Sequence, residues 1–385
     1  MSPRSKKEYT ETTHLRYKRA SRSKKTKIPD EYCATCGCHC KQAIRVRRGF
    51  RRFTKPRARE RGKPTVYHEE KLLKPLKEIW LAANLRCSKR PAALLPLWLP
   101  GYLQHVGSLP EEVCKALLTI SPSTLDRMLS CSRIQHRQRG RSTTKPGTLL
   151  KRQIPIQTNQ WDESRPGFLE ADTVAHCGES MMGMFAFTID CVDIATGWTE
   201  QRAVWGRGER GVLEQIKDIE AALPFPLLGF DCDNGSEFLN YHLFRHFTER
   251  NPPVKFTRSR SYHSQDNAHV EQKNWTHVRQ WIGYDRLDNP QIIPLLNNLY
   301  RNEWRLFHNF FMPSVKLIDK ERIGSKTLKR YDPPKTPCQR IMESAHIAKT
   351  IKDSLSKQLE TLNPFLLRKT IEEKLKKVFS LIAPG

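Results

Sequence analysis

The pattern of apolar and polar positions changes near residue 160. Before that point apolar residues recur at helical spacing, as in "YHEEKLLKPLKEIWLAANL", which predicts helices. After it, "GFLEADTVAH" and "MFAFTIDCVDIATGWTEQRAV" are apolar and β-branched, with turn residues between the runs, which predicts three strands. Helical and strand-like segments then alternate from "GERGVLEQIKDIEAAL" through "PLLGFDCD", "SEFLNYHLFRHFTER" and "VKFTRS" to "DNAHVEQKNWTHVRQWI". Three successive strands followed by this alternation predict an α/β fold with a mixed sheet.

The first 65 residues form a small helical region of their own. A helix-like piece leads to Gly37, and a second, basic piece follows. Helix, glycine turn and basic helix are the outline of a helix-turn-helix, whose second helix lies in the major groove of DNA. The basic helix gives three candidate DNA-binding residues, Lys41, Arg45 and Arg48.

A second helical region covers residues 66–132. It contains two short helices, "PEEVCKALLTI" and "SPSTLDRMLSC", and Ser121 is a good N-cap for the latter. This outline also fits a helix-turn-helix. For either region taken alone, an ordinary helical bundle fits as well.

The rest of the chain divides by composition. Residues 133–160 carry Gly, Pro, Thr and many cations with little periodicity, which is typical of a basic linker. Residues 161–290 hold the predicted sheet. Residues 291–385 are basic and read as helical, with a proline-rich break at "YDPPKTP".

The charge of the chain predicts its partner. The sequence has 67 Lys and Arg against 40 Asp and Glu, a formal net charge of +27, and the cations are spread over several segments. This distribution favours a long polyanion, DNA or RNA, bound at several places. A solvated basic surface or a ribosome-associated protein is the alternative.

The hydropathy of the chain predicts where it acts. No apolar run approaches the roughly 20 residues of a membrane helix, and no apolar core follows the basic residues of the N-terminus. We expect no membrane partner and no signal peptide. The predicted location is the cytoplasm, on the nucleoid when the protein binds DNA, with the cysteines reduced.

A run of cysteines in the first region resembles half of a zinc site. Zinc sites pair two ligand clusters separated by a dozen or more residues, and no second cluster follows here. We therefore do not expect metal binding by this run, which consists of Cys33, Cys36, Cys38, His39 and Cys40.

Acidic residues of the α/β region are the candidates for chemistry. Asp172 lies in the first strand, Asp233 ends a later strand, and Glu271 lies in the last helix, so the three carboxylates can converge. Two such charges 4 Å apart repel by about 4 kcal/mol at an effective dielectric of ~20, so a cluster must take up protons or bind a cation. Oxygen ligands favour Mg²⁺ or Mn²⁺. Spacing alone does not separate these acids from Glu170, Asp190, Asp193 and Asp231.

Three segments resemble a known superfamily. "EADTVAH", "DCDNGSEF" and "SQDNAHVEQKN" are similar to the signature blocks of the DDE transposase and retroviral integrase catalytic core, in the insertion-sequence transposase branch. The resemblance covers about residues 165–285. It implies an RNase H-like core, a five-stranded mixed sheet flanked by helices. It also implies that the catalytic and metal-binding residues are Asp172, Asp233 and Glu271, with Mg²⁺ or Mn²⁺ as cofactor.

The resemblance implies an activity as well. Such an enzyme nicks the ends of a mobile element and joins the freed 3′ hydroxyls to target DNA, without a covalent intermediate or a nucleotide cofactor. We expect Lys273, on the helix of Glu271, to contact DNA, and we expect His176 to be structural rather than a ligand. Joining two ends calls for two active sites, hence a homo-oligomer on DNA. The alternatives are a catalytically inactive DNA-binding relic or repressor of the element, and an RNase H-like nuclease with another substrate.

Overall fold

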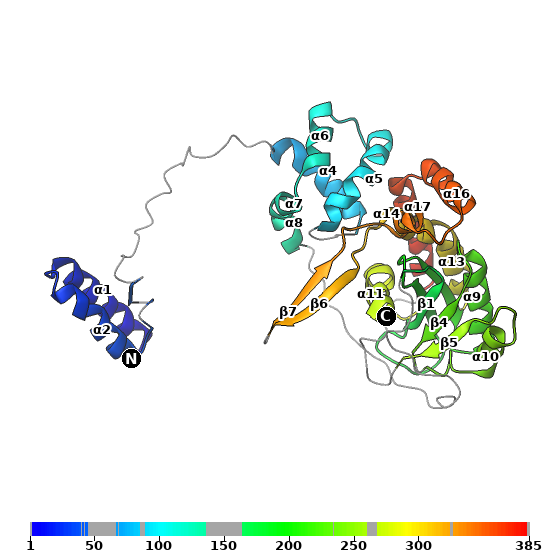
Figure 1. Ribbon diagram of the computed structural model, residues 1–385, viewed down its shortest axis with the longest axis horizontal. Coiled ribbons are helices and arrows are strands. Elements are labelled where there is room, and N and C mark those ends of the chain that lie inside the picture. Colours follow the sequence, from blue (N-terminus) through cyan, green and yellow to red (C-terminus); the bar gives the residue numbers. More distant parts are fainter. Residues whose placement is uncertain are drawn as a thin grey trace. The chain divides into compact units, whose positions relative to one another are not determined.

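The structure is a computed structural model with two compact units, Met1–Val66 and Tyr67–Gly385 (Figure 1). The residues described are 2–39, 41, 43–44, 67, 69–84, 89–135, 164–233, 235–259, 268–323 and 326–382. Among them, no helix has the length and the apolar character needed to cross a membrane.

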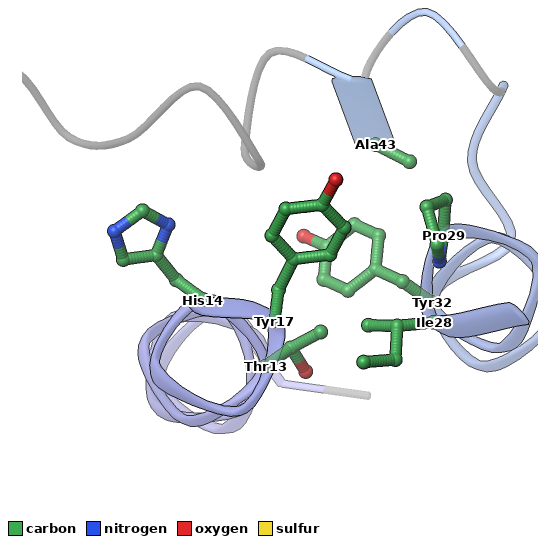
Figure 2. A pocket seen from close by; sticks show the side chains of 7 residues that line it. All are labelled: Thr13, His14, Tyr17, Ile28, Pro29, Tyr32 and Ala43. Atoms are coloured by element: carbon green, nitrogen blue, oxygen red, sulfur yellow. The ribbon is translucent and has the colours of Figure 1, made fainter. Parts of the chain in front are cut away.

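The first unit is built on two helices, α1 (Pro3–Arg19) and α2 (Lys24–Cys36). Helix α2 ends at Gly37, whose left-handed φ of 59° matches the predicted glycine turn. Figure 2 shows that α1 and α2 line one pocket together. The hydroxyl of Tyr32, inside this pocket, lies 2.8 Å from the hydroxyl of Thr10, which ties α2 to α1.

The predicted DNA-reading helix of this unit falls largely outside the described residues. Lys41 is helical and exposed, but Arg45 and Arg48 lie outside them. The helix-turn-helix therefore stays a prediction. Cys33, Cys36 and Cys38 are partly exposed and are not joined in disulfides, and Cys40 lies outside the described residues.

The second unit begins with short helices, and the two predicted from "PEEVCKALLTI" and "SPSTLDRMLSC" are confirmed. Ser121 caps the second of them and accepts a hydrogen bond from the backbone N–H of Thr124 at 3.2 Å. The helices are α4 (Glu69–Ala82), α5 (Lys89–His105), α6 (Glu111–Thr119), α7 (Pro122–Met128) and α8 (Ser130–Gln135).

These helices do not form a domain apart from the rest of the unit. Trp98 of α5 is fully buried, donates its indole N–H to the carbonyl of Phe311 at 3.0 Å and packs edge-on against Phe307 and Phe365. One continuous apolar core joins α4–α7 to the C-terminal helices. The predicted division at residue 132 therefore does not separate two cores.

A five-stranded mixed sheet forms the centre of the unit, as predicted. Its order is β3-β2-β1-β4-β5, with β1–β2 and β2–β3 antiparallel and β1–β4 and β4–β5 parallel (Figure 1). The strands are β1 (Phe168–Ala175), β2 (Ala186–Asp193), β3 (Thr199–Trp205), β4 (Gly229–Cys232) and β5 (Lys255–Arg258). Helices α9 (Glu209–Ala222) and α10 (Tyr241–Thr248) connect the later strands.

Helices cover both faces of this sheet. Ala203 and Val204 are neighbours in β3 and point to opposite faces, since side chains alternate along a strand. Val204 packs in one apolar cluster with Val212 of α9, and Ala203 packs in the other with Leu296. Leu296 belongs to a continuous helical run of α13 (Ile292–Leu299), η2 (Tyr300–Trp304) and α14 (Arg305–Phe311).

Because of this run, the α/β region extends beyond residue 290. Composition predicted that the region ends at residue 290. The amide of Asn297 pairs with both backbone groups of Ala203, at 2.7 and 2.9 Å, and Asn309 pairs in the same way with Thr199. These side chains satisfy the free edge of β3, which would otherwise be open to another strand. Residues after 290 are thus part of the sheet's architecture.

The C-terminal region is also not entirely helical, which corrects the prediction for residues 291–385. It contains an antiparallel hairpin of β6 (Leu317–Ile323) and β7 (Lys326–Tyr331). The strands carry many charged residues, so the alternation typical of a half-buried strand is weak in the sequence. Three helices follow, α15 (Pro337–Glu343), α16 (Lys349–Thr361) and α17 (Pro364–Phe379).

Candidate active site

The sheet register brings the two predicted aspartates together. Ala171 of β1 pairs with Cys232 of β4, and the strands are parallel. Asp172 and Asp233 are the next residues on the two strands, so they lie side by side. The charge of Asp172 accordingly helps to raise the pKa of Asp233.

Asp172 is held by two donors. One carboxylate oxygen accepts the backbone N–H of Thr173 at 2.7 Å, and the other accepts the side-chain amide of Asn274 at 2.6 Å. Burial raises the pKa of Asp172 to about 6, and the charges of Glu271 and Glu237 add to the rise, which the two hydrogen bonds partly offset. The hydrogen bonds fix the direction of the carboxylate, while its surroundings favour a bound proton or cation.

Asp233 is held by the turn that follows it. Its carboxylate accepts the backbone N–H of Gly235 at 2.9 Å. Burial, followed by the charges of Asp172 and Glu237, raises the pKa of Asp233 to about 7. A Cβ at position 235 would lie 2.9 Å from the Asp233 carboxylate and 2.6 Å from that of Glu237. A side chain at this position would therefore displace one or both of these carboxylates. The intervening Asn234 lies outside the described residues.

Glu271 is brought to the site by a helix that β1 anchors. It lies in α11 (Ala268–Lys273), which continues through η1 (Asn274–Arg279) into α12 (Gln280–Ile282). Glu170, two residues before Asp172, accepts the backbone N–H groups of His269 and Val270 at 3.1 and 3.2 Å. The Glu271 residue is exposed to solvent. The protein atoms around its carboxyl group still remove part of its hydration, and this desolvation raises its pKa.

Glu237 is a fourth carboxylate that the prediction gave no role. It is 2% exposed, accepts the hydroxyl of Thr173 at 2.9 Å, and lies 3.6 Å from the guanidinium of Arg207. Its charge raises the pKa of both Asp172 and Asp233. The signal in the sequence was its place in "DCDNGSEF", but its inward direction depends on the turn.

Three of the four competing acids have structural partners. Asp193 accepts the backbone N–H groups of Gly167 and Thr196, and Asp231 accepts the hydroxyl of Thr257. Glu170 anchors α11. These contacts use the acids to fix turns, strands and a helix.

Asp190, the fourth competitor, lies beneath the site. It pairs with Asp172 across β1 and β2, is fully buried, and accepts the amide of Gln201 at 2.8 Å. Burial raises its pKa to about 7, against the lowering effects of that bond and of the charge of Lys273. Asp190 therefore has the surroundings of an inner support and not of a surface ligand.

The placement of Lys273 differs from the DNA contact predicted for it. Its side chain is buried, with 7% of the residue exposed, and its ammonium lies 3.5 Å from the Nε2 atom of His277. The ammonium in this position braces the helix through His277, and its charge acts to lower the pKa of Asp190. Sequence spacing could not show this burial.

His176 has the structural role that was expected. It is fully buried, and its Nε2 atom lies 2.8 Å from the hydroxyl of Thr188, which in turn lies 2.9 Å from that of Tyr300. Burial, with the nearby charge of Arg279, lowers the pKa of His176 to about 3. The imidazole is therefore neutral and holds β1, β2 and η2 together.

The chemistry of the site is set by its oxygen atoms. Asp172, Asp233, Glu237 and Glu271 offer only carboxylate oxygens, which suit a hard divalent cation. Mutual repulsion and burial favour protonation when no cation is bound. In the part of the chain that the structure describes, no three His, Cys, Asp or Glu side chains already have the mutual spacing of a metal site.

Comparison with known proteins gives the family. No protein-family profile matches the sequence. The uncharacterized protein y4rM of Sinorhizobium fredii (strain NBRC 101917 / NGR234) is 38% identical over 335 residues, covering 86% of this chain and 94% of that protein. The chain belongs to the y4rM family. Among solved structures, the catalytic core domain of BIV integrase matches with a TM-score of 0.29 and 13% identity, covering 47% of this chain and 96% of that chain.

Proposed function

We propose that this y4rM-family protein is a DDE transposase of the insertion-sequence branch. It nicks the ends of a mobile element and joins the 3′ hydroxyls to target DNA. The observation that carries the proposal is the adjacency of Asp172 and Asp233 at neighbouring parallel strands, with Glu271 on a helix that Glu170 ties to the same strand. The order and setting of these three acids agree with the resemblance of the sequence blocks.

The proposed cofactor is Mg²⁺ or Mn²⁺, held by Asp172, Asp233 and Glu271. A bound divalent ion supplies Lewis-acid activation of a water or hydroxyl and stabilises the leaving oxygen of a phosphodiester. The chain's own groups orient the ligands. Asn274 and the N–H of Thr173 fix Asp172, and the N–H of Gly235 fixes Asp233. Strong electrostatic help of this kind is needed because phosphate esters hydrolyse very slowly unaided.

The proposed partner is double-stranded DNA, both the element ends and the target. The net charge of +27 supports binding to a polyanion over many phosphates. Each joining event uses two ends, and each end uses one set of acids. We therefore propose that the active form is a homo-oligomer on DNA.

A strand-transfer assay tests this function. The full chain is mixed with a plasmid target and duplexes carrying the DNA that flanks its gene, in Mg²⁺ or Mn²⁺. The expected result is joined product that disappears in Asp172→Asn, Asp233→Asn and Glu271→Gln. Glu249→Gln is the matched control, because that side chain is 68% exposed, and it keeps the activity.

Two results would contradict the proposal. Specific binding of the ends, without joining and equal in wild type and Asp233→Asn, indicates a DNA-binding relic or repressor. Metal-dependent hydrolysis of nucleic acid without any joining indicates a nuclease.

A further inference from the structure

Arg207 stands at the edge of the acid cluster, just after β3. The chain turns there at Gly206, whose left-handed φ is 67°. The guanidinium of Arg207 lies over the ring of Phe187, 5.2 Å from the centre of the ring. One of its nitrogens lies 3.6 Å from the Oε2 atom of Glu237. The Arg207 side chain is 42% exposed, whereas that of Glu237 is 2% exposed. One end of this pair is therefore open to solvent and the other is sealed in the site.

Among the described residues, the N–H donors of the Arg207 guanidinium have no hydrogen-bond acceptor. A separation of 3.6 Å is longer than a hydrogen bond. Within the described ranges the guanidinium makes no hydrogen bond, and neither does the buried Oε2 atom of Glu237. A guanidinium has five N–H donors in a plane, a geometry that matches a carboxylate or a phosphate equally well. The ring of Phe187 holds this group in place without using its donors.

The charges around Arg207 indicate which ligand it binds. The site gathers the carboxylates of Asp172, Asp233 and Glu237, which repel a DNA strand. Arg207 acts on the same cluster, since its charge lowers the pKa of Asp233. Lys273, on the helix of Glu271, is only 7% exposed, whereas the Arg207 side chain is 42% exposed. A strand whose phosphodiester reaches Asp233 passes the exposed face of Arg207.

We propose that Arg207 binds a backbone phosphate of the DNA strand beside the scissile bond. Its guanidinium moves away from Glu237 when it binds that phosphate. The inference rests on the proposed function. It names the residue that positions the strand over the acids, and the ligand is a phosphodiester oxygen. In the absence of DNA, Glu237 keeps the guanidinium close to this position.

The test is a coupling measurement between Arg207 and single phosphates. Binding is measured by fluorescence anisotropy in Mg²⁺, in a Glu271→Gln background that prevents cleavage and leaves Arg207, Glu237 and Asp233 unchanged. The probes are duplexes of the gene-flanking DNA, each with one phosphate near the end replaced by a neutral methylphosphonate. The variants are Arg207→Gln, Arg207→Lys, and Arg207→Gln combined with Glu237→Gln.

A charge-assisted contact predicts a loss of about tenfold or more in affinity for Arg207→Gln, with partial recovery in Arg207→Lys. At one or two positions, the methylphosphonate weakens binding when Arg207 is present and has no effect in Arg207→Gln. The double variant stays as weak as Arg207→Gln. These results support a direct phosphate contact.

Two outcomes overturn the inference. If no phosphate position couples to Arg207, the residue does not touch the backbone there. If the double variant regains full affinity, Arg207 serves only to neutralise Glu237. Failure of the proposed function is seen separately, as a wild-type chain that joins no DNA in the strand-transfer assay. Loss of coupling in a chain that joins DNA contradicts the Arg207 contact alone.

Discussion

Glu170 offers a test of how the site is assembled. It is 5% exposed and accepts two backbone N–H groups at the start of α11, those of His269 and Val270. Replacing it by alanine leaves both donors without this acceptor and frees the first turn of the helix that carries Glu271. Replacing it by glutamine keeps an acceptor oxygen of nearly the same reach.

The structure allows the loss to be estimated. Hydrogen bonds to a charged acceptor contribute about 1.5–3 kcal/mol each. The bonds measure 3.1 and 3.2 Å, at the long end of the usual range, so the lower value applies to both. Glu170→Ala should therefore lower the free energy of unfolding by about 3 kcal/mol. Glu170→Gln should lower it by about half as much, because a neutral acceptor forms weaker bonds.

Urea unfolding followed by tryptophan fluorescence measures this change. The eight tryptophans run from Trp80 to Trp304, so the signal reports on the second unit alone. Glu249→Ala is the control, since its exposed side chain should change stability by less than about 0.5 kcal/mol. If Glu170→Ala costs less than about 1 kcal/mol, or if Glu170→Gln costs as much as alanine, the carboxylate does not hold α11 and the reasoning is wrong.

Three further predictions concern the acids themselves. In the metal-free protein the folded state binds a proton on Asp233 more tightly than the unfolded state, with a pKa near 7 against 3.8, so stability should fall as pH rises from about 4 to 7. Asp233→Asn should remove the share of this slope that Asp233 contributes to melting temperatures, while Asp172 and Asp190, whose pKa values are also raised, keep theirs, and it should abolish stabilisation by Mg²⁺; an unchanged slope would contradict the raised pKa of Asp233. Asn274→Ala removes a hydrogen-bond donor to Asp172, which raises the pKa of that acid. The acidic limb of the pH–rate profile should therefore move to higher pH by about one pH unit. No movement would show that Asp172 does not control this limb. In Gly235→Ala the added Cβ displaces the Asp233 or Glu237 carboxylate, which should reduce strand transfer by about 10²-fold with little loss of stability. Equal activity would refute the close approach of these carboxylates to position 235.

Much of the α/β region could be predicted because its elements are short and clearly patterned. The apolar, β-branched runs became β1 to β5, and the helical segments between them became α9 and α10. The pairing of Asp172 with Asp233 followed from the adjacency of the strand ends, once the parallel register was known. Local pattern was sufficient here because the sheet buries the strands that carry it.

The supporting contacts could not be predicted, because they join residues far apart in sequence. The bond of Asn274 to Asp172 and the anchoring of α11 by Glu170 depend on how the helix lies on β1. The burial of Lys273 depends on the elements around it, so a basic residue beside Glu271 was read as a DNA contact. Spacing made Asp172, Asp233 and Glu271 candidates, while tertiary packing decides which of their neighbours are buried and which are exposed.

The boundaries after the sheet also depend on tertiary structure. Helices beyond residue 290 read as a separate basic region, yet Asn297 and Asn309 close the edge of β3. The hairpin of β6 and β7 carries too many charges for a period of two to stand out. In both places the deciding interaction is with another element, and composition does not record it.

In the proposed reaction the acids of the site act on a phosphodiester through a divalent ion. The most direct measurement replaces one non-bridging oxygen of the scissile phosphate by sulfur and compares single-turnover rates in Mg²⁺ and Mn²⁺. We predict that one diastereomer reacts far more slowly in Mg²⁺ and recovers in Mn²⁺, which accepts sulfur more readily, and that Asp233→Asn is inactive in both. Equal rates in Mg²⁺ for the sulfur and oxygen substrates would contradict a metal ion on that phosphate.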